Sequence, residues 1–288
     1  MTPRPLVGVS VQPGDRFWHH NRRLLEEQAE LFEITPETMW RAGCGRGAGY
    51  AEMLARVTHC GRPVVGHGVL TSIGAASRPA RRSQWLQALL RDRQAFGFQW
   101  FSEHLGFADA ADMHVAWPLP LPPTKEAVAT VATSLRELKA VHEVVAFENN
   151  ADLFCLGDPL AQPDLFGAIC AAADAHLLLD LHNAWAFCRN LEVDFDAWLA
   201  RVPWDRVLEI HLSGGSESDP AWLPSGRSLR LDSHDGVVPG PVWNAFAKAL
   251  GRAGKLRAVV LEWIPEATGQ AAAAQFAGDF ARARSMLC

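Results

Sequence analysis

Acidic and imidazole side chains recur where short apolar segments of the chain end. His67 follows VVG, His104 is the penultimate residue of QWFSEHL, and Glu148 lies near the end of EVVAFEN. Imidazoles and carboxylates without thiolates are typical ligands of Fe, Mn or Zn in reactive sites, whereas many structural zinc sites contain cysteine. The candidate metal ligands selected in this way are His67, His104, Glu148, Asp180, His182, Asn183, His211, Asp232, His234 and Glu262.

One of these residues alone would be weak evidence, because a single histidine at a strand end is more often a hydrogen-bonded structural residue. Five histidines and four carboxylates gathered at one place would bury several negative charges, which is costly unless cations compensate them. Ten side chains also exceed the ligand number of one ion. We therefore predict two or three metal ions, a bridging role for Glu148, and catalytic roles for Glu148, Asp180 and His211.

The segments that carry these residues have the pattern of parallel strands. Short apolar runs rich in β-branched residues alternate with amphipathic stretches of helical length, and nearly continuous apolar runs are typical of strands buried on both faces. The predicted strands cover residues 6–11, 31–36, 64–69, 99–105, 143–149, 176–183, 207–214 and 258–265.

Eight strand–helix units in 288 residues favour a (β/α)₈ TIM barrel of the xylose isomerase type over an open sheet. No linker or change of composition divides the chain, so we expect one domain over residues 1–288. The carboxyl ends of barrel strands build the active site, and the candidate ligands should therefore meet at one rim. Asp180 and His182, two apart on a predicted strand, should project to the same side.

Two longer connections interrupt this pattern. The stretch 214–240, which contains Asp232 and His234, is too long for an ordinary loop, and we expect it to carry a short strand. The proline-rich stretch 117–126 is expected to be a loop after the fourth strand, with Thr124 as the N-cap of the next helix.

Several neighbours of the candidate ligands have two possible roles. Glu33 and Glu37 either accept hydrogen bonds from ligand histidines or are ordinary loop carboxylates. Glu103 points away from His104 on the predicted strand, which favours a supporting or structural role over metal binding. Two tryptophans beside the candidate ligands, Trp185 and Trp263, either wall a substrate pocket or pack in the core.

Composition excludes several classes of protein. Hydrophobic residues make up 49% of the chain and charged residues 20%, which excludes a disordered chain. The net charge of -5 argues against nucleic acid and anionic membranes as partners. Neither a signal peptide nor a membrane-spanning run is present, so a cytoplasmic protein is expected. Six cysteines without a C-x-x-C motif are interpreted as reduced thiols.

In this order, the motifs GHGV, SEHL, FENN, LLLDLHN, EIHLSG, LDSHDG and LEWIP resemble those of the multinuclear non-heme iron-dependent oxidative enzymes, a family that includes the methanobactin biosynthesis oxidase. The resemblance extends over most of the chain. It implies two or three irons (Fe2+/Fe3+), dioxygen (O2) as co-substrate, and the ligands named above, with His182 at a place where relatives vary between Asn and His. It also implies a precursor peptide substrate, modified at Cys or in some branches at Asp, and a small leader-peptide-binding partner protein in a heterodimer.

Two segments depart from the family pattern. GGSESDPAWLPSGR, after EIHLSG, lacks the usual second histidine, and FEITPETMW stands where many relatives carry a Glu-Asn pair. Both departures concern the outcome of the reaction more than the metal site.

Three other functions remain open from the sequence. A divalent-metal sugar isomerase or epimerase of the xylose isomerase type would share the fold, but the four lysines all lie in or beside predicted helices. A metal-dependent endonuclease is disfavoured by the acidic charge. A metal-storage or scaffold subunit would need no turnover.

Overall fold

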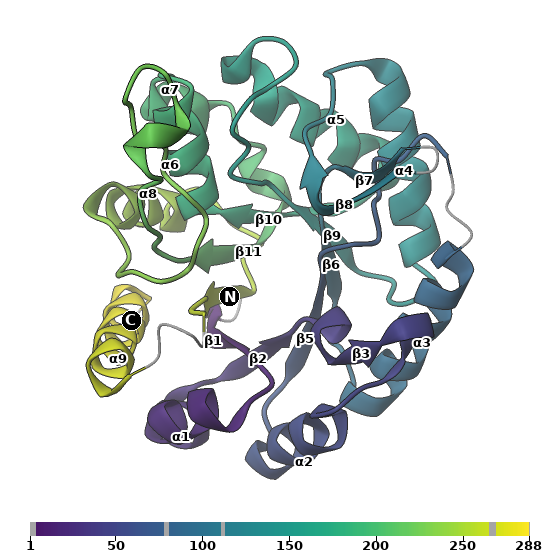
Figure 1. Cartoon of the computed structure of the whole chain (residues 1–288), viewed down its shortest axis with the longest axis vertical. Helices are drawn as coiled ribbons and strands as arrows, with labels where there is room; N and C mark the ends of the chain where they lie inside the picture. The colour runs from purple at the N-terminus through teal and green to yellow at the C-terminus, as the bar shows by residue number, and fades with distance from the viewer. Residues whose placement is uncertain (1–3, 78–80, 111–112, 265–268, 288) are drawn as a thin grey trace.

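The computed structural model describes residues 4–77, 81–110, 113–264 and 269–287, and a closed barrel of parallel strands lies at its centre (Figure 1). β1 pairs with both β2 and β12, which closes the barrel. The predicted TIM barrel is confirmed. Its eight strands are β1 (Leu6–Val11), β2 (Leu31–Ile34), β5 (Val64–Gly68), β6 (Phe101–His104), β9 (Val145–Glu148), β10 (His176–Asp180), β11 (Val207–Leu212) and β12 (Ala258–Leu261).

Helices surround the barrel and cover the outer faces of its strands (Figure 1). Thr124 caps α4 as predicted, because its hydroxyl accepts a hydrogen bond from the backbone N–H of Ala127 at 3.2 Å. The α-helices are α1 (Asp15–Arg23), α2 (Tyr50–Cys60), α3 (Arg81–Phe96), α4 (Lys125–Leu138), α5 (Gln162–Ala173), α6 (Leu181–Asn190), α7 (Phe195–Ala200), α8 (Gly240–Leu250) and α9 (Gln270–Met286).

Alternate residues of the strands build two separate cores. One set packs against the helices, and a smaller cluster, which includes Leu31, Val65, Ala146, Leu178 and Val260, fills the inside of the barrel. Side chains two positions apart on a strand share a face, so the next inward residues stand one layer above this apolar plug. These next residues are all polar and buried: Glu33, His67, Glu148, Asp180 and Glu262.

The prediction for residues 176–183 is wrong at its end. β10 ends at Asp180, and α6 begins at Leu181, within the stretch predicted as strand. The Asp180 carboxylate accepts a hydrogen bond from the backbone N–H of Asn183 at 2.6 Å, which is an N-cap. Asp180 and His182 therefore do not share a strand. A continuous apolar run has no period that would mark where the strand stops.

The remaining predicted strands differ mainly by a few residues at their ends, and residue 265 lies outside the described part of the chain. The loop predicted over 117–126 is wrong for 117–119, which belong to β8 (Met113–Leu119), the partner of β7 (Phe107–Ala110) in an antiparallel hairpin. Pro118 is tolerated there because β8 has β7 as its only strand partner in the described structure and so keeps a free edge. A smaller hairpin joins β3 (Trp40–Arg41) to β4 (Gly45–Arg46).

The insertion 214–240 carries less regular structure than expected. In place of a strand it contains one isolated antiparallel bridge, between Glu217 and Arg230, and a 3₁₀ turn, Pro220–Trp222. Among the helices that the structure describes, none combines the length and apolar character needed to cross a membrane. The described cysteines are free thiols, and Cys288 lies outside the described residues.

We expect Thr124→Ala to lower the free energy of unfolding by about 1 kcal/mol, because α4 loses its N-cap acceptor. For a chain of this size the melting temperature should fall by about 2–4 °C. Thr133→Ala, at a partly exposed position within α4, is the matched control and should leave stability unchanged or slightly higher, since alanine favours helix. Equal losses in the two variants, measured by thermal denaturation, would contradict the capping role.

Candidate metal centre

The carboxyl ends of six neighbouring strands bring buried ligand groups together at one rim of the barrel. Atoms of His67, His104 and Glu148 lie within 4.8 Å of one another. A second group with the same spacing also contains Glu148, and its members are Glu148, Asp180, His211 and Glu262. Glu148 therefore belongs to both groups, as the prediction of a bridging carboxylate requires.

The two oxygens of Glu148 face opposite ways. Its Oε2 lies 3.1 Å from Nε2 of His67 and 3.0 Å from Nε2 of His104. Its Oε1 lies 3.2 Å from Nδ1 of His211, and the same nitrogen is 3.1 Å from Oε2 of Glu262. Each oxygen can thus serve a different ion.

Several of these atoms are buried without a hydrogen bond. They include Oε2 of Glu148, Oδ2 of Asp180 and Nδ1 of His211. A buried polar atom without a partner costs free energy, and native structures contain few of them. Their convergence on one place, with carboxylate and imidazole donors only, fits the binding of cations such as Fe, Mn or Zn.

Neighbouring polar groups orient the histidines of the first group. Nδ1 of His67 lies 2.8 Å from the hydroxyl of Ser102, and Nδ1 of His104 lies 2.7 Å from Oδ1 of Asn150. Both rings therefore present Nε2 to Glu148. Partners of this kind fix ring orientation in metal sites. Sequence analysis missed Ser102 and Asn150, although Ser102 lies two residues before a ligand and Asn150 two residues after one.

A different partner orients His211. Its Nε2 lies 3.0 Å from Oε2 of Glu33, which leaves Nδ1 for the metal groups. Of the two roles left open for Glu33, the structure supports contact with a ligand histidine. Below this pair Glu209 accepts a hydrogen bond from Nε1 of Trp100 at 2.7 Å. Burial, followed by the nearby Glu33, raises the pKa of Glu209 to about 8.

The other two carboxylates singled out near the rim bind backbone instead. Oε1 of Glu37 accepts from the N–H of Val69 at 3.0 Å, and Oε1 of Glu103 accepts from the N–H of Thr71 at 3.4 Å. Burial raises the pKa of both carboxyls, that of Glu103 to about 8 with Glu37 adding to the effect. Both residues hold the loop after β5, which is a structural role.

The insertion and α6 add a third group of polar side chains beside the second. Oδ1 of Asp232 lies 2.5 Å from Nε2 of His234 and 3.8 Å from Nδ1 of His182. The same nitrogen of His234 is 3.6 Å from Oε2 of Glu262, which connects this group to the barrel strands. His234 has a positive φ of 50°, a backbone conformation that is uncommon outside glycine and frequent at functional sites.

Two glycines bring the insertion back over the rim. A Cβ on Gly214 would lie 2.2 Å from the carbonyl oxygen of Val237, and one on Gly215 would lie 2.1 Å from that of Leu231. Only glycine permits backbones to approach so closely. The insertion thus returns to its starting point at β11, and this contact positions Asp232 and His234.

The structure places His182 and Asn183 in the first turn of α6. Nε2 of His182 accepts a hydrogen bond from Nε of Arg230 at 3.1 Å, whereas its Nδ1 is buried without a hydrogen bond, 3.8 Å from Oδ1 of Asp232. Oδ1 of Asn183 is buried without a partner, while its amide nitrogen donates to the Asn149 carbonyl at 3.3 Å. Asn183 and His182 therefore each keep one buried polar atom without a hydrogen bond.

Charges at the rim shift one another's pKa values. Burial alone would lower the pKa of His104, but the adjacent Glu148 outweighs burial and raises it to about 10. Burial raises the pKa of Asp180 well above its usual range, and Asp232 and Glu148 add to this. The pKa of Glu148 lies well below its usual range despite burial, because three histidines face it. Metal binding at such a cluster would release protons.

Tryptophans mark the sides of the centre. The ring centroid of Trp185 lies 5.9 Å from that of His182, whereas Trp263 is 3% exposed and packs on Phe276, which makes it a core residue. Sequence analysis missed Trp117, which is 43% exposed and whose ring centroid lies 5.4 Å from that of His104.

Known structures share this fold at low identity. A D-psicose 3-epimerase with D-tagatose from Clostridium cellulolyticum H10 is 12% identical, with a TM-score of 0.56, and the match covers 98% of this chain and 94% of that one. A xylose isomerase-like TIM barrel protein from Mycobacterium smegmatis, in complex with magnesium, is 14% identical with a TM-score of 0.57 over 100% and 98% of the two chains. These similarities show the fold alone.

Sequence relatives are closer. A UPF0276 protein of Caulobacter vibrioides is 32% identical over 200 residues, which cover 69% of this chain and 68% of that protein. A UPF0276 protein of Anaeromyxobacter sp. (strain Fw109-5) is 32% identical over 268 residues, covering 90% and 87%. Residues 14–286 match the family model of the RiPP precursor modification enzymes MbnB/TglH/ChrH, where RiPP denotes a ribosomally synthesised and post-translationally modified peptide. The chain, with its buried histidine and carboxylate clusters, belongs to this family of enzymes.

Proposed function

We propose that this protein is a multinuclear non-heme iron enzyme that uses O2 to oxidise a residue of a ribosomally made precursor peptide. We expect this residue to be Cys, with Asp as the alternative. The observation that carries the proposal is the position of Glu148, whose two oxygens face two separate groups of buried ligands. Such a carboxylate suits adjacent ions better than a single one. The family match supports the peptide substrate.

The ligand groups divide among the proposed ions as the distances suggest. His67 and His104 would hold one ion with Glu148, and Asp180, His211 and Glu262 would hold a second on its other side. Asp232 and His234, beside Glu262, are the residues for a third ion. His182 and Asn183 remain in the proposed ligand set, since each has a buried polar atom without a hydrogen bond.

Iron, when bound, supplies O2 activation and the redox equivalents for the oxidation. The chain itself keeps bulk water away: the apolar plug closes the barrel below, and the ligands from the strands are all buried. The low dielectric of such a site strengthens the interactions of its charged groups, including those with a substrate thiolate or carboxylate. Ser102, Asn150 and Glu33 hold the ligand rings in place.

A partner protein is also part of the proposal. We expect a small leader-peptide-binding protein to form a heterodimer with this chain and present the precursor to the rim. Large exposed apolar side chains support contact with a peptide or protein at the rim. In the described part of the chain they lie on the segments that follow β6, β9 and β11. They are Trp117, Leu153, Phe154, Leu156, Trp222 and Val237. We further propose a cytoplasmic location, in keeping with the free thiols of the described cysteines.

A sugar isomerase or epimerase is the second candidate, because proteins with these activities share the fold. Isomerases of this type would need a lysine near the metals, and none of the four lysines is among the buried polar groups of the rim. Lys125 is the first residue of α4 and Lys139 follows its last one. Lys248 pairs with Asp196, and Lys255 lies at the opposite end of the barrel. Interconversion of ketose and aldose without O2 would favour this candidate.

Protein purified without oxygen should contain more than one iron per chain. Glu148→Gln removes the shared charge and should lower the content below one ion per chain, measured by elemental analysis. Asp164→Asn, an exposed change on α5, is the control and should keep the full content. Stoichiometric zinc without iron, after expression in iron-replete cells, would count against the proposal.

Replacing Glu33 by Gln should weaken metal binding or turnover by about 10- to 100-fold, because His211 loses the charged acceptor that orients it. Metal affinity by chelator competition is the measurement. Glu30→Gln, a partly exposed carboxylate bound to Arg4, is a suitable control. If Glu33→Gln retained the affinity of the unmodified protein, the orienting role would be wrong.

Oxygen consumption should require the precursor peptide and the leader-binding partner together. A short Cys- or Asp-containing reading frame beside this gene, with a companion protein, is where we expect both to be found. Mass spectrometry should detect an oxidised peptide, and Glu148→Ala should abolish it. A mere scaffold would still support the pathway in that variant.

A further inference from the structure

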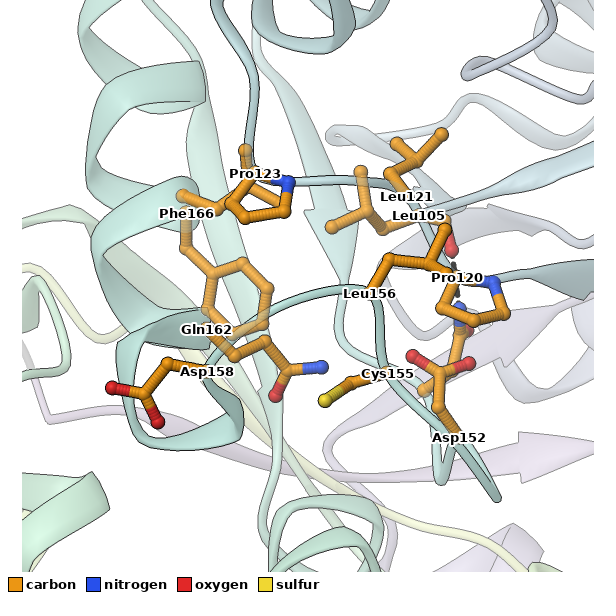
Figure 2. A pocket seen from close by; sticks show the side chains of 12 residues that line it. Leu105, Pro120, Leu121, Pro123, Asp152, Cys155, Leu156, Asp158, Gln162 and Phe166 are labelled. Atoms are coloured by element: carbon orange, nitrogen blue, oxygen red, sulfur yellow. Dashed lines mark hydrogen bonds between the residues drawn. The ribbon is translucent and has the colours of Figure 1, made fainter.

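A pocket opens beside the metal centre, between the β8–α4 connection, the β9–α5 loop and α5 (Figure 2). Pro120, Leu121 and Pro123 of the connection give it apolar walls, together with Phe166 of α5. It is a narrow cavity of about 30 Å³ with an opening to solvent. The ligand groups described above are not among its lining residues, so the metal site leaves it without a role.

Two polar side chains of this pocket, Asp152 and Gln162, have acceptor oxygens without a donor. Asp152 is 8% exposed, and within the described part of the chain no hydrogen bond or ion pair reaches its carboxylate. Oε1 of Gln162 is buried without a donor. Figure 2 shows Asp152 on the loop side of the pocket and the Gln162 amide directed into it from α5. None of the lining residues is basic.

A ligand that satisfies this pocket must therefore bring hydrogen-bond donors on an apolar stem. Buried acceptors without donors are costly, and a carboxylate in an apolar surrounding favours a cationic partner. Burial raises the pKa of Asp152 to about 7, with His104 opposing the shift, so a bound cation would also keep this carboxyl ionised. Lysine and arginine side chains have both required parts.

The position of the pocket connects it to the chemistry. Asn150 lines the pocket and also lies 2.7 Å from Nδ1 of His104. Exposed Trp117, in contact with His104, precedes the prolines of the pocket wall by a few residues. A peptide whose reacting residue sits at the metal groups would pass this pocket with a neighbouring residue.

We propose that the pocket is a subsite for a basic side chain, lysine or arginine, of the substrate peptide, with its charged head at Asp152 and Gln162 and its stem on the apolar walls. The identity of the occupant as a peptide rests on the proposed function. The preference for a cationic head on an apolar stem is independent of the proposed function.

Fragment binding to the full chain tests the preference. n-Butylguanidinium and n-butylammonium serve as probes and n-pentanol as the neutral counterpart, with dissociation constants from saturation-transfer NMR. We expect the cations to bind in the millimolar range, with pentanol at least about tenfold weaker. Asp152→Asn and Gln162→Leu should each weaken cation binding, Asp152→Asn by about tenfold or more, whereas Asp164→Asn, on α5 but outside the pocket, should not.

Two results would overturn the subsite. One is equal binding of pentanol and the cations, which would make the pocket merely apolar. The other is unchanged cation binding in Asp152→Asn with the fold retained, as judged by its circular dichroism and melting temperature.

A second experiment identifies the source of the basic group. Each lysine or arginine of the precursor is replaced in turn by norleucine. At one position we expect KM to rise about tenfold with kcat unchanged, and Asp152→Asn should remove that difference. If no position behaves so while the fragments bind, the occupant is a free amine and the peptide assignment is wrong. If the precursor is not oxidised at all, the proposed function fails, while fragment binding is judged separately.

Discussion

The structure depends on one shared carboxylate in a place where water cannot satisfy it. Glu148 lies between two groups of buried ligands, and strand register brings its neighbours to it: His104 pairs directly with Glu148 across β6 and β9, and Asp180 pairs with His211 across β10 and β11. Parallel strands in register place equivalent inward residues side by side. The arrangement therefore follows from the closure of the barrel, and its charges are tolerable only when protons or cations are shared among them.

The layer beneath this centre is as important as the ligands. An apolar plug, with Leu178 and Val260 among its members, fills the barrel directly below the polar layer. Side chains on a strand alternate between its two faces. A shift of one residue in strand register would therefore turn the inward side chains of both layers outward, toward the helices. Packing thus fixes the positions of groups that would repel one another if they were free to separate, and the same packing keeps the site dry.

The barrel is shared with sugar epimerases and isomerases, so the fold alone does not select the reaction. Two additions to the barrel lie at the rim of this chain. The insertion returns to β11 through Gly214 and Gly215 and adds Asp232 and His234, and the β7–β8 hairpin carries Trp117 beside His104. These additions bring further carboxylate and imidazole groups to one side of the rim and place an exposed tryptophan on the other.

The sequence by itself determined the barrel and most residues at its rim, because a buried parallel strand is a recognisable apolar run and the polar residue that ends it must lie at the carboxyl edge. It did not reveal the end of β10, since an apolar run has no period and only the cap formed by Asp180 shows where the helix begins. The contact of Glu33 with His211 joins residues 178 positions apart. Contacts of this kind, and the contact of the insertion with the end of β11, depend on how the closed barrel brings distant segments together. No local pattern of residues encodes them.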